Sequence, residues 1–445
     1  MITRGRVSLQ SASRYAALYV VLVGYSAIYE YFYEYQLTPL FHDMFTAYDP
    51  ARAGIYTAIR YLTPLAILPI GTKLRAAGQF IAGTLAVILF IPIPIVFVPM
   101  TSVQDYWQIY IFLWIGYFTV CVLSKLDIRV HPPNITDEGY GRLLTGVFVL
   151  LGLGLAYVFV TNHVQLVSLS KAHAARAKVT VSGLQGYLVP GYMSSFGGLL
   201  VAVAVAYRRY YLIPAALIGF IVCYATMEER TAAILPLWIA YIFVMQRYFF
   251  RGSAIRFLTV IMAPFLVLVC GAIIMGTTHR HSIFYYLFTL AAYRVYSIPA
   301  IGFNVYHNFF SFNPHTYWSH INMLSKFIPS PYNGESLGSV MDQAYRLGSY
   351  NASFIETDGV AAAGIWAIPW VGALFGVILV GINSCMRRLD VRLLALVSAG
   401  SSFALMDTGI GPGLLTNGLI ALSLMLYFAP RRPPWTEAEQ RTRSA

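Results

Sequence analysis

The stretch Gln79–Val98 reads QFIAGTLAVILFIPIPIVFV, 20 residues without a charged side chain. An α-helix that crosses the hydrocarbon core of a membrane takes about 20 predominantly apolar residues. The stretch therefore predicts a transmembrane helix. The Ile91-Pro-Ile-Pro94 sequence inside it predicts a kink, which is tolerated in a membrane when neighbouring helices satisfy the backbone carbonyls that proline leaves free.

The composition of the whole chain agrees with this prediction. The 445 residues are 58% hydrophobic and 11% charged, with a mean hydropathy of +0.64. Soluble domains contain about 25% charged residues, so the chain is a polytopic membrane protein by composition. The formal net charge of +12 does not indicate nucleic acid, because the cations stand singly or in pairs at the ends of apolar runs, as the positive-inside rule distributes them.

Apolar runs of spanning length recur along the chain. Their number predicts an all-α fold of about 12 transmembrane helices, near Tyr15–Tyr31, Ala53–Ile70, Gln79–Val98, Trp107–Leu123, Leu143–Val160, Tyr187–Ala206, Tyr211–Met227, Thr231–Val244, Phe257–Met275, Val360–Ile382, Leu393–Met406 and Leu414–Phe428. If both termini are cytoplasmic, 20 of the 30 Lys and Arg residues fall in cytoplasmic segments, in agreement with the positive-inside rule.

The segment 277–358 is the one long interruption of this pattern. We therefore divide the chain into an N-terminal transmembrane region of about nine helices (1–276), a large external loop (277–358), about three C-terminal helices (359–430) and a cytoplasmic tail (431–445). Ser282–Ile298 is apolar enough to be a thirteenth span, but a further crossing would place the later arginine pairs outside. Its tyrosines also suit the membrane interface, so we predict an amphipathic helix on the outer leaflet.

Ten cations depart from the positive-inside pattern, and four of them lie in the loop. Arg60 falls inside the second run, where an intramembrane charge predicts a buried partner or a polar cavity. A polyanion bound at the outer membrane face would compensate for the charge of these ten cations, because arginine pairs with phosphate oxygens in two-point contacts. The ten cations are Arg52, Arg60, Lys171, Arg176, Lys178, Arg230, Arg280, Arg294, Lys326 and Arg346.

The histidines do not form a recognisable metal motif. His279 and His281 are spaced for chelation only on a strand, and His307, His315 and His320 have no Asp or Glu at helical spacing. The chain contains no H-E-x-x-H or D-x-D sequence. We therefore expect no metal and no cofactor, with arginines supplying the positive charge that a divalent ion would supply at a diphosphate.

Three local sequences resemble a known family. They are Glu229-Arg230-Thr231-Ala-Ala-Ile-Leu before a helix, Tyr293-Arg294-Val-Tyr296 followed by Pro299, and Ala352-Ser-Phe-Ile-Glu-Thr-Asp358-Gly359-Val-Ala-Ala-Ala-Gly364 after the loop. With the order of helices and loop over nearly the whole chain, they are similar to bacterial oligosaccharide repeat-unit polymerases of the O-antigen polymerase (Wzy) type. The related ligases commonly have a His-Asn/Ser pair where this chain has Tyr350-Asn351, a difference that favours the polymerase.

The resemblance implies an inner-membrane glycosyltransferase of polysaccharide and lipopolysaccharide biosynthesis. It would move a growing glycan from its undecaprenyl diphosphate carrier to a newly delivered lipid-linked unit at the periplasmic face, with the segment 277–358 as its periplasmic loop. Membrane lipids and a chain-length regulator protein would be its other partners. Positive charge at the leaving diphosphate is the electrostatic requirement of such a reaction.

The expected site residues follow from this reaction. Substrate binding is assigned to Arg230, Arg280, Arg294 and Arg346, with Tyr293, Tyr296, Tyr306 and Trp318 as faces for sugar stacking. Each aromatic residue could instead serve core packing. The candidates for the base are Glu229, His281, Asp358 and Glu356, which the sequence does not rank. An O-antigen ligase and, less favoured, a transporter of the lipid-linked glycan stay open as alternatives, and Arg60 is the feature that favours transport most.

Overall fold

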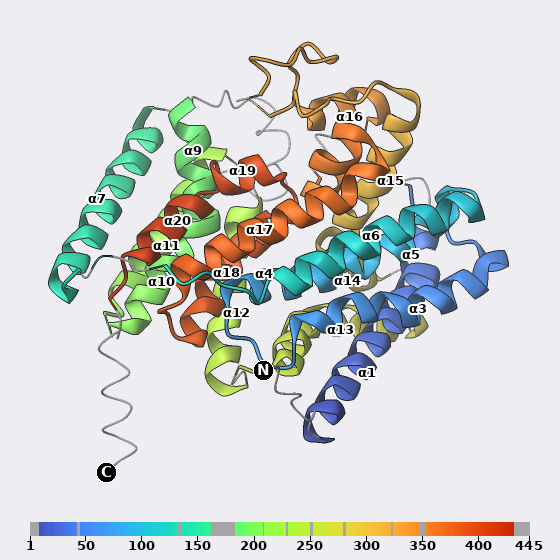
Figure 1. Ribbon diagram of the computed structural model, residues 1–445, viewed down its shortest axis with the longest axis horizontal. Helices are drawn as coiled ribbons and strands as arrows, with labels where there is room; N and C mark the ends of the chain where they lie inside the picture. Colours follow the sequence, from blue (N-terminus) through green and yellow to red (C-terminus); the bar gives the residue numbers. More distant parts are fainter. Residues whose placement is uncertain are drawn as a thin grey trace, which may run out of the picture.

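The computed structural model describes residues 9–41, 45–130, 133, 135–161, 183–207, 209–227, 230–249, 252–278, 282–321, 324–346 and 352–430. Within these ranges the regular structure is helical, and strand pairing is limited to one bridge between Lys73 and Ser253. Figure 1 shows the arrangement. The α-helices are α1 (Leu9–Phe32), α2 (Thr38–Phe41), α3 (Ala53–Ile67), α4 (Ala77–Leu85), α5 (Pro92–Phe97), α6 (Val103–Leu123), α7 (Asp137–Thr161), α9 (Gly183–Gly191), α10 (Gly197–Ala206), α11 (Leu212–Met227), α12 (Arg230–Tyr248), α13 (Ala254–Thr278), α14 (Ile283–Ala292), α15 (Ile298–Phe312), α16 (Leu337–Tyr345), α17 (Ile368–Met386), α18 (Val391–Ala404), α19 (Ile410–Leu414) and α20 (Leu419–Tyr427).

Nine helical stretches of the described residues are long and apolar enough to cross a membrane. They confirm a multi-pass membrane protein and are Ser11–Phe41, Pro50–Ile70, Ala77–Met100, Val103–Leu123, Asp137–Thr161, Gly183–Ala206, Thr231–Tyr248, Ala254–Gly276 and Ile365–Met386. Three of the twelve expected spans correspond to shorter helices: α11, α18 and α20. The expected span Val360–Ile382 starts later, because Gly364 has a φ of 77°, a conformation that ends the preceding helical turn.

The apolar stretch quoted at the outset forms the centre of the molecule. Helix α4, a π-helical turn at Ala86–Phe90 and helix α5 follow one another without a break, and every residue from Ala77 to Val98 is buried. Helices α13, α15, α17 and α18 all contact this central helix or its π turn. A helix that is apolar all round is expected in such a position.

A π-helical turn at Ala86–Phe90 comes directly before the prolines at which a kink was predicted, and neighbouring helices satisfy carbonyls along this part of the chain. The amide of Ile91 bonds to Ala86 at 3.1 Å instead of Val87, so the Val87 carbonyl loses its helical donor. The hydroxyl of Tyr25 on α1 donates to that carbonyl at 3.1 Å. Tyr106 on α6 donates to the Pro94 carbonyl in the same way at 3.1 Å. Tyrosine hydroxyls therefore replace water as donors to the backbone carbonyls of Val87 and Pro94.

Helices α6 and α17 run side by side through the middle of the molecule (Figure 1). Glycines allow this close approach. A Cβ atom on Gly372 would lie 2.6 Å from the carbonyl oxygen of Gly116, and one on Gly376 would lie 2.6 Å from Leu123. Gly372 and Gly376 have the small-xxx-small spacing by which transmembrane helices bring their backbones together.

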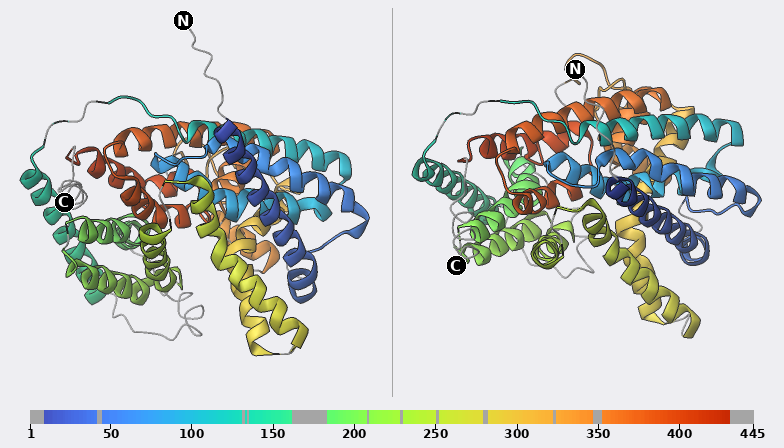
Figure 2. Two further views of the ribbon diagram at one scale, coloured as in Figure 1. Left: turned by 90° about the horizontal axis from the view of Figure 1, so that it is seen from below. Right: turned by 60° about the horizontal axis from the view of Figure 1, so that its bottom comes forward.

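The segment expected to be an external loop is largely helical. Helix α14, a π turn at Tyr293–Ser297 and helix α15 follow one another without a break, and α14 packs against α13. Figure 2 shows α13 and α14 projecting together from the body of the protein. Tyr285, Tyr293 and Tyr296, which were expected to face the membrane interface, have side chains buried within the protein.

Helix α15 then enters the protein interior. It packs on α5 and on the π-helical segment Ile355–Ala361, named η8, and ten of its residues are buried.

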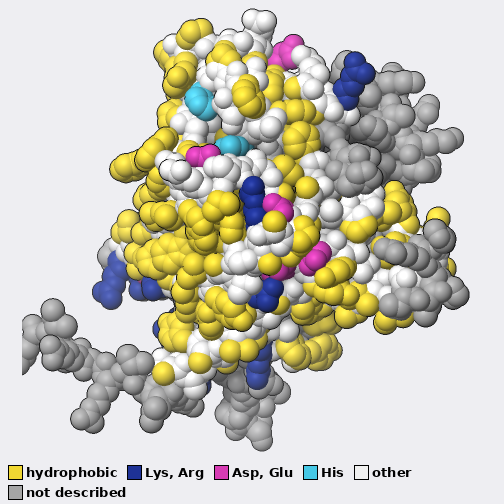
Figure 3. Space-filling model, turned by 90° about the vertical axis from the view of Figure 1, so that its right-hand side faces the viewer, with side chains coloured by type: hydrophobic (Ala, Val, Ile, Leu, Met, Phe, Trp, Pro, Cys, Tyr) yellow, Lys and Arg dark blue, Asp and Glu magenta, His cyan; other side chains and the backbone are white. Residues whose placement is uncertain are grey.

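The outer surface of the molecule exposes many hydrophobic side chains. Figure 3 shows one face on which hydrophobic side chains predominate and charged ones are few, as expected for a surface in contact with lipid.

Candidate functional site

The cavity that we assign as the candidate site has a volume of about 720 Å³ and lies between segments distant in sequence. Tyr187 comes from α9, Tyr306 from α15, Asp358 from η8 and Trp370 from α17. Further lining comes from the segment before α16, from the segment 407–416 that contains α19, and from the first turns of α16 and α20. Its residues before α16 are Trp318, His320, Ile321 and Leu324. The volume is within the usual range for small-molecule and cofactor sites, about 300–1,000 Å³.

A histidine and an aspartate face each other in the wall of this cavity. His320 Nε2 lies 3.4 Å from Asp358 Oδ1, and their side chains are 11% and 5% exposed. The second oxygen of Asp358 accepts the backbone amide of Ile410 at 2.6 Å. Asp358 is therefore held from two sides while it still lines the cavity, a geometry suited to a general base.

The loop that carries His320 is fixed to η8 by backbone hydrogen bonds. Thr316 and Tyr317 donate their amides to Ala361 and Ala362 at 2.8 and 2.9 Å. Trp318 donates its indole N–H to the carbonyl of Asp358 at 3.1 Å. Tyr317 and Trp318 both have positive φ angles, 48° and 63°, which are unusual for bulky residues. Strained conformations of this kind cluster at functional sites, and here they turn the chain so that His320 reaches Asp358.

A glycine makes room for the carboxylate on the opposite side. A Cβ atom on Gly409 would lie 2.9 Å from Asp358 Oδ2 and 2.8 Å from Thr357 Oγ1. Both distances are too short for unstrained contact, so the backbone of the loop 407–411 can approach Asp358 only because residue 409 has no side chain. The same approach positions the Ile410 amide for its hydrogen bond.

A second carboxyl lies behind the cavity wall. Glu356 is 0% exposed and receives a hydrogen bond from the Ser353 hydroxyl on Oε2. Its Oε1 has no hydrogen-bond partner among the described residues. Burial raises the pKa of Glu356 to about 8, and the negative charge of Asp407 adds to this while the bond from Ser353 opposes it. Glu356, which precedes the span at Ile365, is therefore protonated at neutral pH.

The cavity lining combines polar and apolar side chains. His320, Asp358 and Asp407 are its ionisable groups besides two tyrosines. Among its apolar residues, Trp370 on α17 is 77% exposed and Leu415 after α19 is 58% exposed. Leu374, Leu414 and Ile420 are further apolar lining residues.

Only some of the residues expected at the site meet there. Asp358, Tyr306 and Trp318 line the cavity. Tyr293 instead stacks on Phe41 with ring centroids 4.4 Å apart, and Tyr296 packs against Phe265 at 4.9 Å. Packing therefore accounts for these two tyrosines, and the structure places them away from the cavity.

The expected arginines do not converge on the cavity within the described residues. Arg294 is exposed in the π turn before α15, and Arg346 is exposed at the end of α16. Arg230 begins α12, but its side chain lies outside the described part of the structure, as do Glu229, Arg280 and His281. Among the described residues, the cavity lining contains no Lys or Arg.

Sequence reasoning missed His320 and Asp407. His320 was set aside because no acidic residue follows it at helical spacing, yet its partner is 38 residues away in sequence. Proximity to the post-loop segment 352–364 was the one signal that could have drawn attention to it. Asp407 follows a predicted helix and carried no motif.

The intramembrane arginine has the buried partner that its position predicted. Arg60 on α3 makes bonds of 2.8–3.1 Å to both carboxylate oxygens of Glu30 on α1. Glu30 lies within α1, which continues to Phe32. Arg52 bonds to the carbonyls of Val98 and Thr101, each at 2.5 Å. Both cations therefore have structural partners within the protein.

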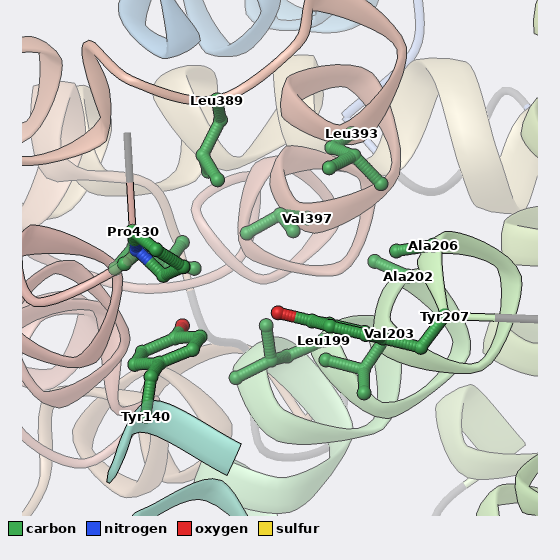
Figure 4. Close-up of a pocket in the computed structure, with 12 residues that line it drawn as sticks. Tyr140, Leu199, Ala202, Val203, Ala206, Tyr207, Leu389, Leu393, Val397 and Pro430 are labelled. Atoms are coloured by element: carbon green, nitrogen blue, oxygen red, sulfur yellow. The ribbon is translucent and has the colours of Figure 1, made fainter. Parts of the chain in front are cut away.

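A small crevice elsewhere does not have the features of a site. It lies among α10, α18 and the end of the described chain, with the side chains of Tyr140 and Tyr207 beside aliphatic ones (Figure 4). Its volume of about 30 Å³ has room for one or two water molecules.

A comparison of the chain with protein-family models, curated proteins and solved structures finds no match in any of the three.

Proposed function

We propose that this protein is a glycosyltransferase that polymerises oligosaccharide repeat units carried on undecaprenyl diphosphate. The observation that carries the proposal is the composition of one cavity. Its lining combines the His320–Asp358 pair and the aromatic residues Tyr306 and Trp318 with exposed apolar side chains such as Trp370. The polar and aromatic residues suit a sugar, because aromatic rings pack on sugar faces. The exposed apolar residues suit a lipid chain.

The orientation of α17 supports a periplasmic position for the cavity. This helix begins beside the cavity and ends at Met386, directly before Arg387 and Arg388. Its 19 residues span about 28 Å at 1.5 Å per residue, close to the thickness of the hydrocarbon core. The positive-inside rule assigns the arginine end to the cytoplasm, so the cavity opens on the other side of the bacterial inner membrane.

The same reasoning extends to the remaining topology. Both termini are cytoplasmic in this proposal. The shorter helices α11 and α18, and the consecutive helices α19 and α20 taken together, complete about twelve crossings beside the nine longer stretches.

The proposed reaction assigns a role to each part of the cavity. Asp358 takes the proton from the attacking hydroxyl of the acceptor sugar. The acceptor oxygen forms a bond to the anomeric carbon of the growing chain, while the bond from that carbon to the diphosphate oxygen breaks. The electron pair of the broken bond leaves with the diphosphate, and arginines stabilise its charge. Arg230 and Arg280, whose side chains lie outside the described residues, are the proposed arginines, since Arg294 and Arg346 do not line the cavity.

Deletion of the gene and complementation test the function. Without the protein, the surface polysaccharide of the host should collapse on a gel from a ladder to a single repeat on core. Asp358→Asn should fail to restore the ladder, with activity at least about 100-fold lower because the base is lost. Thr145→Val, which removes an exposed hydroxyl bonded only within α7, should restore it.

Other outcomes distinguish the alternatives. Bare core with long polymer still on the lipid carrier would identify an O-antigen ligase instead. An unchanged ladder would reject both transferases and favour a transporter of the lipid-linked glycan. The pairing of Arg60 with Glu30 removes the feature that favoured transport, since the arginine has a structural role there.

A further inference from the structure

We propose that the cavity opens sideways to the membrane between α17 and α20, and that this opening holds the isoprenoid chain of the donor, the lipid whose diphosphate leaves in the reaction. The inference rests on the proposed glycosyl transfer, and it says which of the two lipid-linked substrates the opening takes. It follows from the position of the apolar lining residues on their helices and from the order of bonds in the two substrates.

Four residues spaced three or four apart share one face of α17 and of the turn before it. They are Trp366, Trp370, Leu374 and Val377, and each is more than half exposed. Trp370 and Leu374 line the cavity, whereas Trp366 and Val377 do not. Because the two outer members are exposed without lining the cavity, this face is the outer surface of the molecule. The cavity therefore reaches that surface at Trp370 and Leu374.

The other side of the opening comes from the segment of α19 and α20. Leu415, directly after α19, and Ile420, in the first turn of α20, line the cavity and are themselves exposed. Helices α17 and α20 pack against each other (Figure 1). The opening is therefore bounded on both sides by apolar side chains that also face outward.

The opening lies at the depth of the hydrocarbon core. The span that contains α17 runs from Ile365 to Met386. At 1.5 Å per residue, Trp370 lies about 8 Å and Leu374 about 14 Å along this span. The whole span is long enough to cross a core of about 30 Å. An opening at this depth faces lipid, so it admits an apolar chain from the side and not a soluble ligand from the aqueous phase.

The proposed base is close to this opening. Asp358 lines the same cavity, and η8, which carries it, packs against α17. A Cβ atom on Gly359 would lie 3.5 Å from Ile368 Cγ1. The residue after Asp358 is therefore in contact with the first turn of α17, two residues before Trp370. Atoms that react beside Asp358 are next to the lipid opening.

The order of bonds distinguishes the two substrates. In the donor, the reacting anomeric carbon is bonded to the diphosphate, and the isoprenoid chain follows the second phosphate directly. In the acceptor, the reacting hydroxyl is on the terminal sugar, and the rest of the repeat unit separates it from its own lipid. Asp358 takes the hydroxyl proton, and the electron pair of the broken carbon–oxygen bond leaves with the donor diphosphate. Only the donor therefore has its lipid beside the base, and undecaprenyl diphosphate leaves through the same opening.

Transfer by the purified protein in lipid nanodiscs tests the assignment with substrates that act in one role only. A repeat unit on undecaprenyl diphosphate that lacks the terminal hydroxyl is a donor only. A repeat unit joined to an undecaprenyl diphosphate analogue by an anomeric carbon–carbon bond is an acceptor only. Leu374→Trp, which narrows the opening, should raise the KM for the donor by about tenfold or more and leave the KM for the acceptor unchanged. Val377→Trp, on the same exposed face but outside the cavity lining, is the matched control and should behave as the wild type.

Photocrosslinking identifies the occupant without turnover. With p-benzoylphenylalanine in place of Leu374, the protein should capture undecaprenyl diphosphate from nanodiscs that contain phosphatidylglycerol in excess. With the same group in place of Val377, it should capture phospholipid. A raised KM for the acceptor instead of the donor, an unchanged KM for both, or capture of phospholipid alone at position 374 would overturn the assignment. Capture of undecaprenyl diphosphate by a protein that shows no transfer would instead reject the proposed function and leave the lipid site intact.

Discussion

Replacement of the buried Glu356 by glutamine should change how stability depends on pH. In the native protein burial raises the pKa of this carboxyl from 4.5 to about 8. Between these values the folded state keeps the proton while the unfolded chain releases it. The folded state therefore binds more protons than the unfolded state in this window, so the stability of the wild type falls as the pH rises from about 4.5 to about 8.

The magnitude follows from the same shift. Each pH unit inside the window costs up to about 1.4 kcal/mol, so the contribution of Glu356 declines by roughly 3 kcal/mol between pH 5 and pH 8. Solvent does not screen this contribution to the free energy of unfolding, because the Glu356 side chain is 0% exposed. Glu356→Gln removes the titration and keeps the shape of the neutral acid, so its stability should lack this decline.

Thermal unfolding in detergent at pH 5, 6, 7 and 8 measures the difference. The gap between the two proteins should move by several degrees in favour of Glu356→Gln as the pH rises. Glu138→Gln is the matched control, because that carboxyl is 77% exposed and should show no comparable trend. Parallel curves for the wild type and Glu356→Gln would refute the claim that Glu356 is buried as a neutral acid.

Three further substitutions probe the packing and the site. Gly409→Ala should lower the rate of transfer by about tenfold or more, because the added Cβ would lie 2.9 Å from Asp358 Oδ2 and displace the base. The amount of protein in the membrane, measured by quantitative blotting beside the transfer assay, should stay the same. Gly372→Leu should destabilise the protein by about 1–3 kcal/mol through overpacking at α6, seen as a lower unfolding temperature. Arg60→Leu should destabilise it by about 3 kcal/mol, because Glu30 would be left buried without a partner, and the double change Arg60→Leu with Glu30→Leu should recover much of the loss.

The transmembrane character could be predicted from the sequence because it depends on local composition alone. Runs such as Gln79–Val98 have no alternative to burial in lipid or protein, whatever the tertiary contacts. The lengths of the helices were less predictable. Leu414–Phe428 was expected to be one span, but α19 ends at Leu414 and α20 begins only at Leu419, after Gly418 with its φ of 73°. Hydropathy does not distinguish a continuous helix from two short ones joined at a glycine.

The candidate site could be predicted only in part, for a different physical reason. Asp358 was identified because it lies in a conspicuous segment after the loop, where a local pattern is visible. His320 was not, because a pair of side chains 38 residues apart has no periodicity to reveal it. For Tyr293 and Tyr296 the sequence left sugar stacking and core packing open, since an aromatic residue that binds a ligand and one that fills a core look the same in sequence.

The position of the site also depends on the apolar helix at the centre of the molecule. Asn304 on α15 donates to the Val96 carbonyl of the central helix at 3.2 Å, and α15 packs against both α5 and η8. Tyr306, two residues further on, lines the cavity, and η8 carries Asp358. The central helix therefore positions α15 along its axis, and α15 in turn packs against η8, which carries the proposed base. This chain of contacts explains why a stretch without a single charged residue governs the placement of the charged groups in the cavity.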